Sequence, residues 1–309
     1  MVLVGLVVGG CARPAGAQEL VNEALASFPE GTIRVEYSHP SVLRALPNYQ
    51  VLRHQYEGPR LQQLEESFSK LGVQESDVDE LVLGWQASGQ EWLFYGLTSG
   101  RFSTTALAER AHDQGIKAVT LDGQAAYCVG TGTEENCLAV LGDSLGAFGS
   151  QASLRAILAA RVGSGTSLDS SGTLAKYVRE SETSAPIWGV ATGPAVPDWY
   201  RGWMPNQTNL KLDWSQAFKT VEALTYSIEP GDTVRLKVRM DCTSSAEATS
   251  LGQVFEGLRL FQQLTWENQN PGRPNPYKDL QIQVNEKRVS IELDTPYSNL
   301  MAFGGAGGL

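Results

Sequence analysis

The sequence predicts an α+β fold that consists of two related modules, each an antiparallel sheet packed by helices. Composition is the first indication, because 42% hydrophobic and 19% charged residues in a chain of 309 are typical of a globular protein. Short segments of alternating polarity, separated by turn residues, indicate strands, and segments with apolar residues three or four positions apart indicate helices. The same order of elements occurs in residues 18–162 and in residues 187–303, which indicates a structural duplication.

Proline and glycine mark the elements of the first module. Pro40 and Pro59 each open a helical segment, and Gly72 follows the end of one. The pair Asp122-Gly123 is a strong hairpin signal. In chain order we expect a helix at 18–27, a strand at 32–37, helices at 41–56 and 61–71, a hairpin of 80–86 and 91–97, a helix at 103–114, strands at 116–121, 124–129, 137–141 and 145–148, and a helix at 151–160.

Residues 163–186 are rich in glycine and serine, and we expect them to connect the modules, with one short helix at 174–178. In strand 233–242 of the second module, four apolar residues alternate with Arg235, Lys237 and Arg239, which predicts a buried face and a basic outer face. The second module is expected to contain a strand at 187–191, a helical turn at 197–203, strands at 219–228 and 233–242, a long helix at 245–267, and strands at 280–284 and 289–293. A flexible tail at 304–309 is expected to follow the module.

Both modules therefore run strand, helix, hairpin, helix, hairpin. This is the order of the split βαβ unit of ferredoxin-like folds, with an additional strand.

The N-terminus is similar to the end of a bacterial lipoprotein signal. Residues 1–10 are apolar and uncharged, and Cys11 follows two glycines. A lipid on Cys11 would tether the protein, whereas cleavage at the Ala-x-Ala site that ends at Ala17 would release it. A buried N-terminal strand is the structural alternative. A membrane span needs about 20 apolar residues, so we expect residues 1–17 to be a signal segment instead. The absence of Lys or Arg before Cys11 departs from the signal pattern, and a true start further upstream would explain it.

Export to the cell envelope, the periplasm or the medium makes a disulfide bond between Cys128 and Cys137 the expected state of these residues. Strand-like segments flank the short loop between them, so pairing of the strands would bring the two cysteines face to face. Two buried thiols are the alternative. Cys242 is expected to be a small buried hydrophobic residue. The cysteine spacing does not match a zinc site and no histidine lies near, so we expect neither a metal site nor a cofactor.

Residues 212–261 combine an aromatic start, an alternating strand pair and an alanine-rich helix, and residues 137–150 form an apolar hairpin that a helix follows. These patterns resemble an uncharacterised family of exported bacterial proteins. The resemblance covers most of the mature chain. It implies the α+β fold and the envelope location, and it implies no catalytic residue.

The net charge limits the partners. A formal charge of −10 and a pI near 4.9 disfavour nucleic acid and anionic lipid, because the surface would repel phosphate. We expect no nucleic-acid partner, membrane contact only through a lipid on Cys11, and an envelope protein or a glycan as a possible partner.

The segment Gly142-Asp-Ser144-Leu-Gly146 matches two serine-esterase motifs, Gly-x-Ser-x-Gly and Gly-Asp-Ser-Leu. A serine nucleophile needs a base within hydrogen-bond reach, and in both families that base is a histidine that follows the serine. Here every histidine precedes Ser144, and the segment fits the turn of a hairpin. We expect a turn, with a cryptic serine hydrolase as the alternative. The three histidines are His39, His54 and His112.

Five aromatic residues lie close together at the start of the second module: Trp188, Trp199, Tyr200, Trp203 and Trp214. They could form a platform for a glycan or peptide, or fill the gap between the modules as packing. We expect a non-catalytic binding or structural protein whose ligand site, if present, lies at this segment. A periplasmic carrier of an apolar ligand is a further alternative, and it would need a cavity between a sheet and its long helix.

Overall fold

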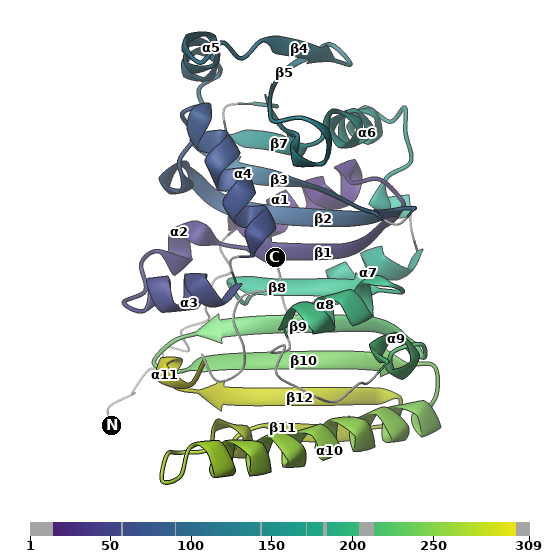
Figure 1. Ribbon diagram of the computed structural model, residues 1–309. Coiled ribbons are helices and arrows are strands. Elements are labelled where there is room, and N and C mark those ends of the chain that lie inside the picture. The colour runs from purple at the N-terminus through teal and green to yellow at the C-terminus, as the bar shows by residue number, and fades with distance from the viewer. Residues whose placement is uncertain are drawn as a thin grey trace, which may run out of the picture.

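A computed structural model describes residues 15–56, 58–89, 91–142, 144–170, 172–181, 184–203 and 213–300. They form one antiparallel sheet of twelve strands, in the order β11-β12-β10-β9-β8-β1-β2-β3-β7-β6-β5-β4, with helices on both faces (Figure 1). The α+β class is therefore confirmed. Cys11 and the tail 304–309 lie outside the described residues, and of the expected signal segment only Ala15 to Ala17 are described, at the start of the first helix.

The two modules share one plan of strand pairing. In each, three consecutive strands lie side by side, and the last strand of the module pairs with the third: β7 with β3, and β12 with β10. The first module has β1 (Thr32–Ser38), β2 (Val78–Ser88), β3 (Glu91–Gly100), β4 (Ala118–Leu121), β5 (Gln124–Val129), β6 (Asn136–Val140) and β7 (Leu145–Gly149). The second has β8 (Ile187–Thr192), β9 (Val221–Pro230), β10 (Val234–Cys242), β11 (Gln281–Asn285) and β12 (Arg288–Thr295).

The first strands of the two modules join them. β1 and β8 pair antiparallel, with Val35 opposite Val190, so a single sheet runs through both modules. The recurrence of the plan on either side of this pair fits a duplication. The strand order differs from the expected split βαβ unit, in which another strand lies between the first two strands of the chain. Here β2 lies directly beside β1, because the helices between them return the chain antiparallel to its starting strand.

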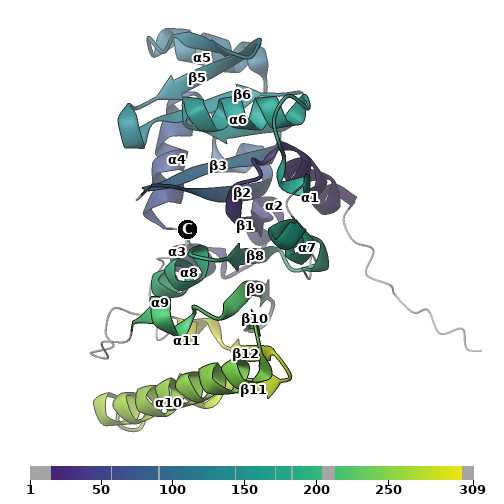
Figure 2. The ribbon, with the colours of Figure 1, turned by 90° about the vertical axis from the view of Figure 1, so that its right-hand side faces the viewer.

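Helices divide between two faces of the sheet, which we call face A and face B. Figure 2 shows α3, α4, α8 and α9 on one side of the sheet and α1 and α7 on the other. The helices of face A are α2 (Pro40–Leu43), α3 (Tyr49–Tyr56), α4 (Pro59–Lys70), α5 (Thr104–Asp113), α8 (Ala195–Trp203), α9 (Trp214–Ala217), α10 (Ser245–Gln269) and α11 (Tyr297–Leu300). Those of face B are α1 (Ala15–Ser27), α6 (Gln151–Arg161) and α7 (Gly172–Glu180).

Local chemistry explains most element boundaries. The helix expected at 41–56 is two helices, because Pro47 between α2 and α3 lacks a backbone N–H and disfavours helical conformation in the residue before it. The expected hairpin turn is confirmed at Asp122 and Gly123, which both have positive φ, 48° and 83°. A two-residue turn of this kind matches the twist of the strands it joins, here β4 and β5.

The glycine- and serine-rich connection packs against face B. Leu168, Leu174 and Val178 are buried in the same hydrophobic core as α1 and α6. Helix α7 is longer than expected and contacts β1, β8 and β9, so it lies over the strands where the modules meet. The module boundaries at 162 and 187 stay a prediction.

Candidate functional site

A cavity of about 390 Å³ lies on face A of the first module, between helices α3 and α4 and the sheet. We call it the module-one cavity. Leu81, Leu138 and Phe148 reach it from β2, β6 and β7, and Leu61, Leu64 and Phe68 reach it from α4. Its interior is therefore largely apolar.

The sequence of α4 explains its apolar side. Pro59 stands at the start of the helix, where its missing N–H costs nothing. Leu61, Leu64 and Phe68 follow at spacings of three and four, which places them on one face of a helix. Gly72, with φ of 78°, stands just beyond the end of the helix.

Charged side chains line the more exposed part of the cavity. The Arg53 guanidinium on α3 binds the Glu65 carboxylate on α4 and, at 2.8 Å, the Glu75 carboxylate that follows α4. The Tyr49 hydroxyl donates a hydrogen bond to the same Glu75 carboxylate. Arg44 donates to the backbone carbonyl of Glu75 at 2.7 Å. Arg53, Glu65 and Glu75 are half-buried, so the site combines an apolar interior with a charged rim that water can reach.

The expected aromatic site is divided between the two faces. Trp188 lies on face B and stacks on Tyr37, with ring centroids 5.6 Å apart. Trp199 and Tyr200 lie on face A, where Trp199 packs on Tyr226 at 4.9 Å and Tyr200 on Trp214 at 4.3 Å. The side chain of Trp203 is outside the described residues.

Burial favours the packing role for three of these residues. Trp188, Trp199 and Tyr200 are buried, whereas a platform has to present its rings to a ligand. Trp214 is half-buried at the edge of the cluster. A ligand site at this segment stays a prediction.

A buried charge pair lies where the modules meet, and the sequence pattern did not reveal it. The Arg34 guanidinium donates two hydrogen bonds to Oε1 of Glu36 on β1 and lies over the ring of Trp85, 4.3 Å from its centroid. Burial raises the pKa of Glu36, and the charge of Arg34 opposes that shift. Alternating charged residues in a strand usually indicate a solvent-facing side. The close approach of Gly189, where a Cβ would lie 2.9 Å from Cγ of Glu36, became visible only in the folded protein.

Ser144 is exposed in the short turn between β6 and β7, as the hairpin interpretation predicts. The segment that follows it is strand β7, not a helix, so the strand-to-helix corner of a nucleophile elbow does not form here. Within the described part of the chain, no hydrogen bond joins the Ser144 hydroxyl to a histidine. The Ser144 backbone carbonyl accepts from the Gly100 N–H at 3.0 Å, which ties the turn to the end of β3.

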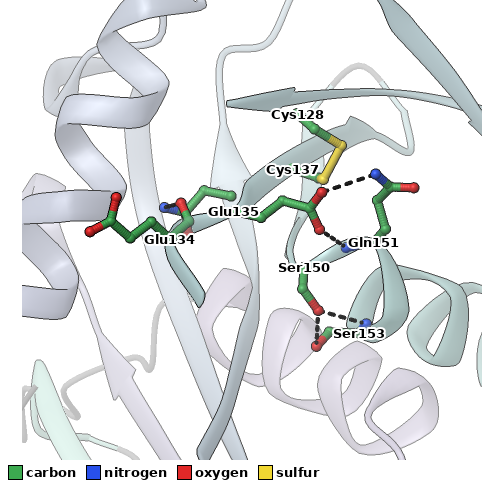
Figure 3. Close-up of a disulfide and its surroundings, with 8 residues drawn as sticks. Cys128, Glu134, Glu135, Cys137, Ser150, Gln151 and Ser153 are labelled. Atoms are coloured by element: carbon green, nitrogen blue, oxygen red, sulfur yellow. Dashed lines mark hydrogen bonds between the residues drawn. A yellow bond between two sulfur atoms is a disulfide. The ribbon is translucent and has the colours of Figure 1, made fainter. Parts of the chain in front are cut away.

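The disulfide bond between Cys128 and Cys137 is confirmed (Figure 3). The two residues stand directly opposite each other on β5 and β6.

Cys242 is a free buried thiol, as expected, and burial raises its pKa to about 11. It therefore stays protonated near neutral pH and is a poor nucleophile.

Among the residues that the structure describes, no helix has both the length and the hydrophobicity to cross a membrane.

The fold is that of a protein with one antiparallel sheet through two modules, and comparisons find solved structures with a similar fold. Neither a protein-family model nor a curated protein matches the sequence. Crystal form III of TP0453 is similar, with a TM-score of 0.53 at 10% identity, over 91% of this chain and 96% of that one. Crystal form I gives 0.51 at 10% identity, over 90% and 94% of the two chains. Crystal form IV gives 0.50 at 11% identity, over 90% and 95%. At such low identity the likeness shows the fold alone.

Proposed function

We propose that the protein is an exported, non-catalytic binding module that holds one small amphiphilic molecule in the module-one cavity. The observation that carries this proposal is the cavity itself. Its volume of about 390 Å³ lies within the range of roughly 300–1,000 Å³ that is typical of small-molecule sites.

The lining selects the class of ligand. Leucine and phenylalanine side chains would take up an apolar body, because burying apolar surface contributes about 25 cal/mol per Å². The rim of Arg53, Glu65 and Glu75 would face the polar end of the molecule. A ligand with an apolar body and one polar end uses both parts of the site, whereas a wholly polar ligand leaves the interior unfilled.

The carrier alternative required a cavity between a sheet and its long helix, and a filled core there counts against it. Leu251, Phe255 and Leu258 of α10, the long helix, are buried in the core. The ligand-sized space lies instead beneath α4 of the first module.

Two features support export. A disulfide bond such as that of Cys128 and Cys137 forms and persists in oxidising compartments. The apolar segment before Cys11 has the pattern of a signal. Whether Cys11 carries a lipid or is removed with the signal decides between a tethered and a free protein, and mass spectrometry of the mature N-terminus distinguishes the two.

The non-catalytic part of the proposal has its own test. Within the described residues no hydrogen bond joins the Ser144 hydroxyl to a histidine, and a serine nucleophile needs such a base. We expect a fluorophosphonate probe to leave Ser144 unlabelled in the mature protein. Labelling that a Ser144→Ala change abolishes would establish the hydrolase alternative.

Binding is tested with N-phenyl-1-naphthylamine, an apolar probe whose fluorescence rises out of water. We expect one saturable site per chain. Val73→Phe adds a ring at a half-buried lining position, and we expect it to weaken binding at least about tenfold, the equivalent of about 1.4 kcal/mol.

Val162→Phe is the matched control, because Val162 is 75% exposed at the end of α6, a helix of face B. It should bind the probe like the unchanged protein, and both variants should keep their circular dichroism spectra. Should Val73→Phe unfold, Val78→Phe tests the same lining from β2. Equal binding by folded lining variants and the control would refute the proposed site.

A further inference from the structure

Three potential metal ligands converge beside helix α6 on face B. One sulfur each from Cys128 and Cys137 and a carboxylate oxygen of Glu135 all lie within 4.8 Å of one another (Figure 3). Sulfur and carboxylate oxygen are both ligands of zinc in proteins. The cluster is separate from the module-one cavity, which lies on face A.

The two sulfurs are held together by more than their covalent bond. Cys128 and Cys137 are opposite residues of the β5–β6 ladder. The neighbouring pairs on both sides are also in register, Tyr127 with Leu138 and Val129 with Asn136. β6 is paired on its other edge as well, since Cys137 stands opposite Gly149 of β7. The backbone ladder would therefore keep the cysteines face to face after the sulfur–sulfur bond is broken.

The Glu135 carboxylate is oriented by the first turn of α6. Its Oε2 accepts from the Gln151 backbone N–H at 2.9 Å, and its Oε1 accepts from the Gln151 side-chain amide at 3.0 Å (Figure 3). A carboxylate oxygen can accept more than one bond, so each keeps a lone pair for another partner. Hydrogen bonds of this kind fix metal ligands in place and strengthen binding.

We propose that the reduced protein binds one Zn²⁺ ion through Cys128, Cys137 and Glu135. Two molecules of a small thiol reductant supply two electrons and two protons: the disulfide opens to two thiols, and the reductant becomes its own disulfide. The metal then displaces both thiol protons to solvent and accepts two thiolates and the carboxylate. A water molecule completes the tetrahedral set.

The ligand set favours zinc over the common hard cations. Two thiolates are soft ligands, which Ca²⁺ and Mg²⁺ do not prefer, while the borderline Zn²⁺ accepts both sulfur and oxygen. Cys137 is buried, whereas Cys128 and Glu135 are half-buried, so the ion can reach the site from solvent. Cys128 and Cys137 thus form a covalent cross-link under oxidising conditions and, together with Glu135, a metal cross-link under reducing ones.

Cobalt is the spectroscopic probe for this site. The full chain is reduced, freed of reductant under anaerobic conditions and titrated with Co²⁺. We expect one equivalent to produce thiolate-to-cobalt absorption in the near ultraviolet and tetrahedral ligand-field bands in the visible, and Zn²⁺ to remove both. The oxidised protein should show neither.

Variants identify the ligands. Cys242→Ser is the control and should leave the cobalt spectrum unchanged, because Cys242 is not part of the cluster. Cys137→Ser and Cys128→Ser should each lower the thiolate absorption by about half or abolish binding, and Glu135→Gln should weaken binding about tenfold or more. A reduced wild-type protein without cobalt bands, or bands that need Cys242 and survive Cys137→Ser, would overturn the proposal.

Discussion

The inner strands of the first module are buried on both faces of the sheet, whereas the third strand of the second module is buried on one. On face B, β3 of the first module places Tyr95 and Leu97 beneath helices α1 and α6. The corresponding third strand of the second module, β10, directs Arg235, Lys237 and Arg239 to the same face. Face B of the second module has a hollow of only about 170 Å³, and charged side chains line much of it.

This difference has a physical origin that is visible in the strands. Residues 80–85 of β2 are buried without interruption, as in strands covered on both sides. In β10 buried residues such as Val238 and Met240 alternate with partly exposed basic ones. The same pairing plan therefore accommodates a two-sided and a one-sided core, and the second module needs no helices equivalent to α1 and α6. The ligand-sized cavity occurs in the two-sided module.

The largest expected effect is at the junction that both modules share. Arg34→Met would leave the Glu36 carboxyl buried without its counter-charge, and we expect a loss of about 3–5 kcal/mol in unfolding free energy at pH 8. Burial raises the pKa of Glu36 above 4.5. A group whose pKa is raised in the folded protein contributes its full stability at pH values below its pKa in the unfolded state. That contribution is lost as pH rises through its pKa in the folded state. The loss should therefore be smaller at pH 4, as urea unfolding would show.

The double variant Arg34→Met with Glu36→Leu is the control for that prediction. It removes both charges and should recover most of the loss. A single variant whose destabilisation is equal at pH 4 and pH 8 would contradict the role assigned to Glu36.

The next largest effect tests the covered face B of the first module. Leu97 is fully buried on β3, and Leu97→Ala should cost about 3 kcal/mol because it removes apolar contacts and leaves a cavity. Urea or thermal unfolding measures the loss. A cost below about 1 kcal/mol would mean that α1 and α6 do not seal this face.

The disulfide bond of the first module should contribute about 2.5 kcal/mol, from the loss of chain entropy in the unfolded state of a short loop. Replacing Cys128 and Cys137 with alanine should lower the unfolding free energy by that amount and make it insensitive to a thiol reductant in the absence of metal. Cys242→Ser should remain sensitive to the reductant. If the double variant still responded to reductant, another bond would have to be involved.

The smallest effect is expected on the open face of the second module. Arg235 is exposed and forms ion pairs with Glu229 and Asp294 at 3.4 and 3.3 Å. Such surface pairs contribute little, so Arg235→Ala should change the unfolding free energy by no more than about 0.5 kcal/mol. A loss comparable with that of Leu97→Ala would show that this face is not solvent-exposed, and the contrast between the modules would fail.

The sequence alone determined the local structure of the protein. Periodicity, proline, glycine and the Asp122-Gly123 turn depend on residues within a few positions of one another, and they predicted most helices and strands and the alternating burial of β10. The Cys128–Cys137 bond was predictable for the same reason, because a short hairpin brings both residues together.

Only the tertiary structure decided which distant segments share a face. The pairing of β1 with β8 joined the modules into one sheet and buried Arg34 and Glu36, which alternate like residues of an exposed strand. Packing of α4 over β2, β6 and β7 made the cavity, and the approach of α6 fixed Glu135 near the two sulfurs. Such contacts join residues that are far apart in the chain, and the local pattern of polarity carries no information about which of them will meet.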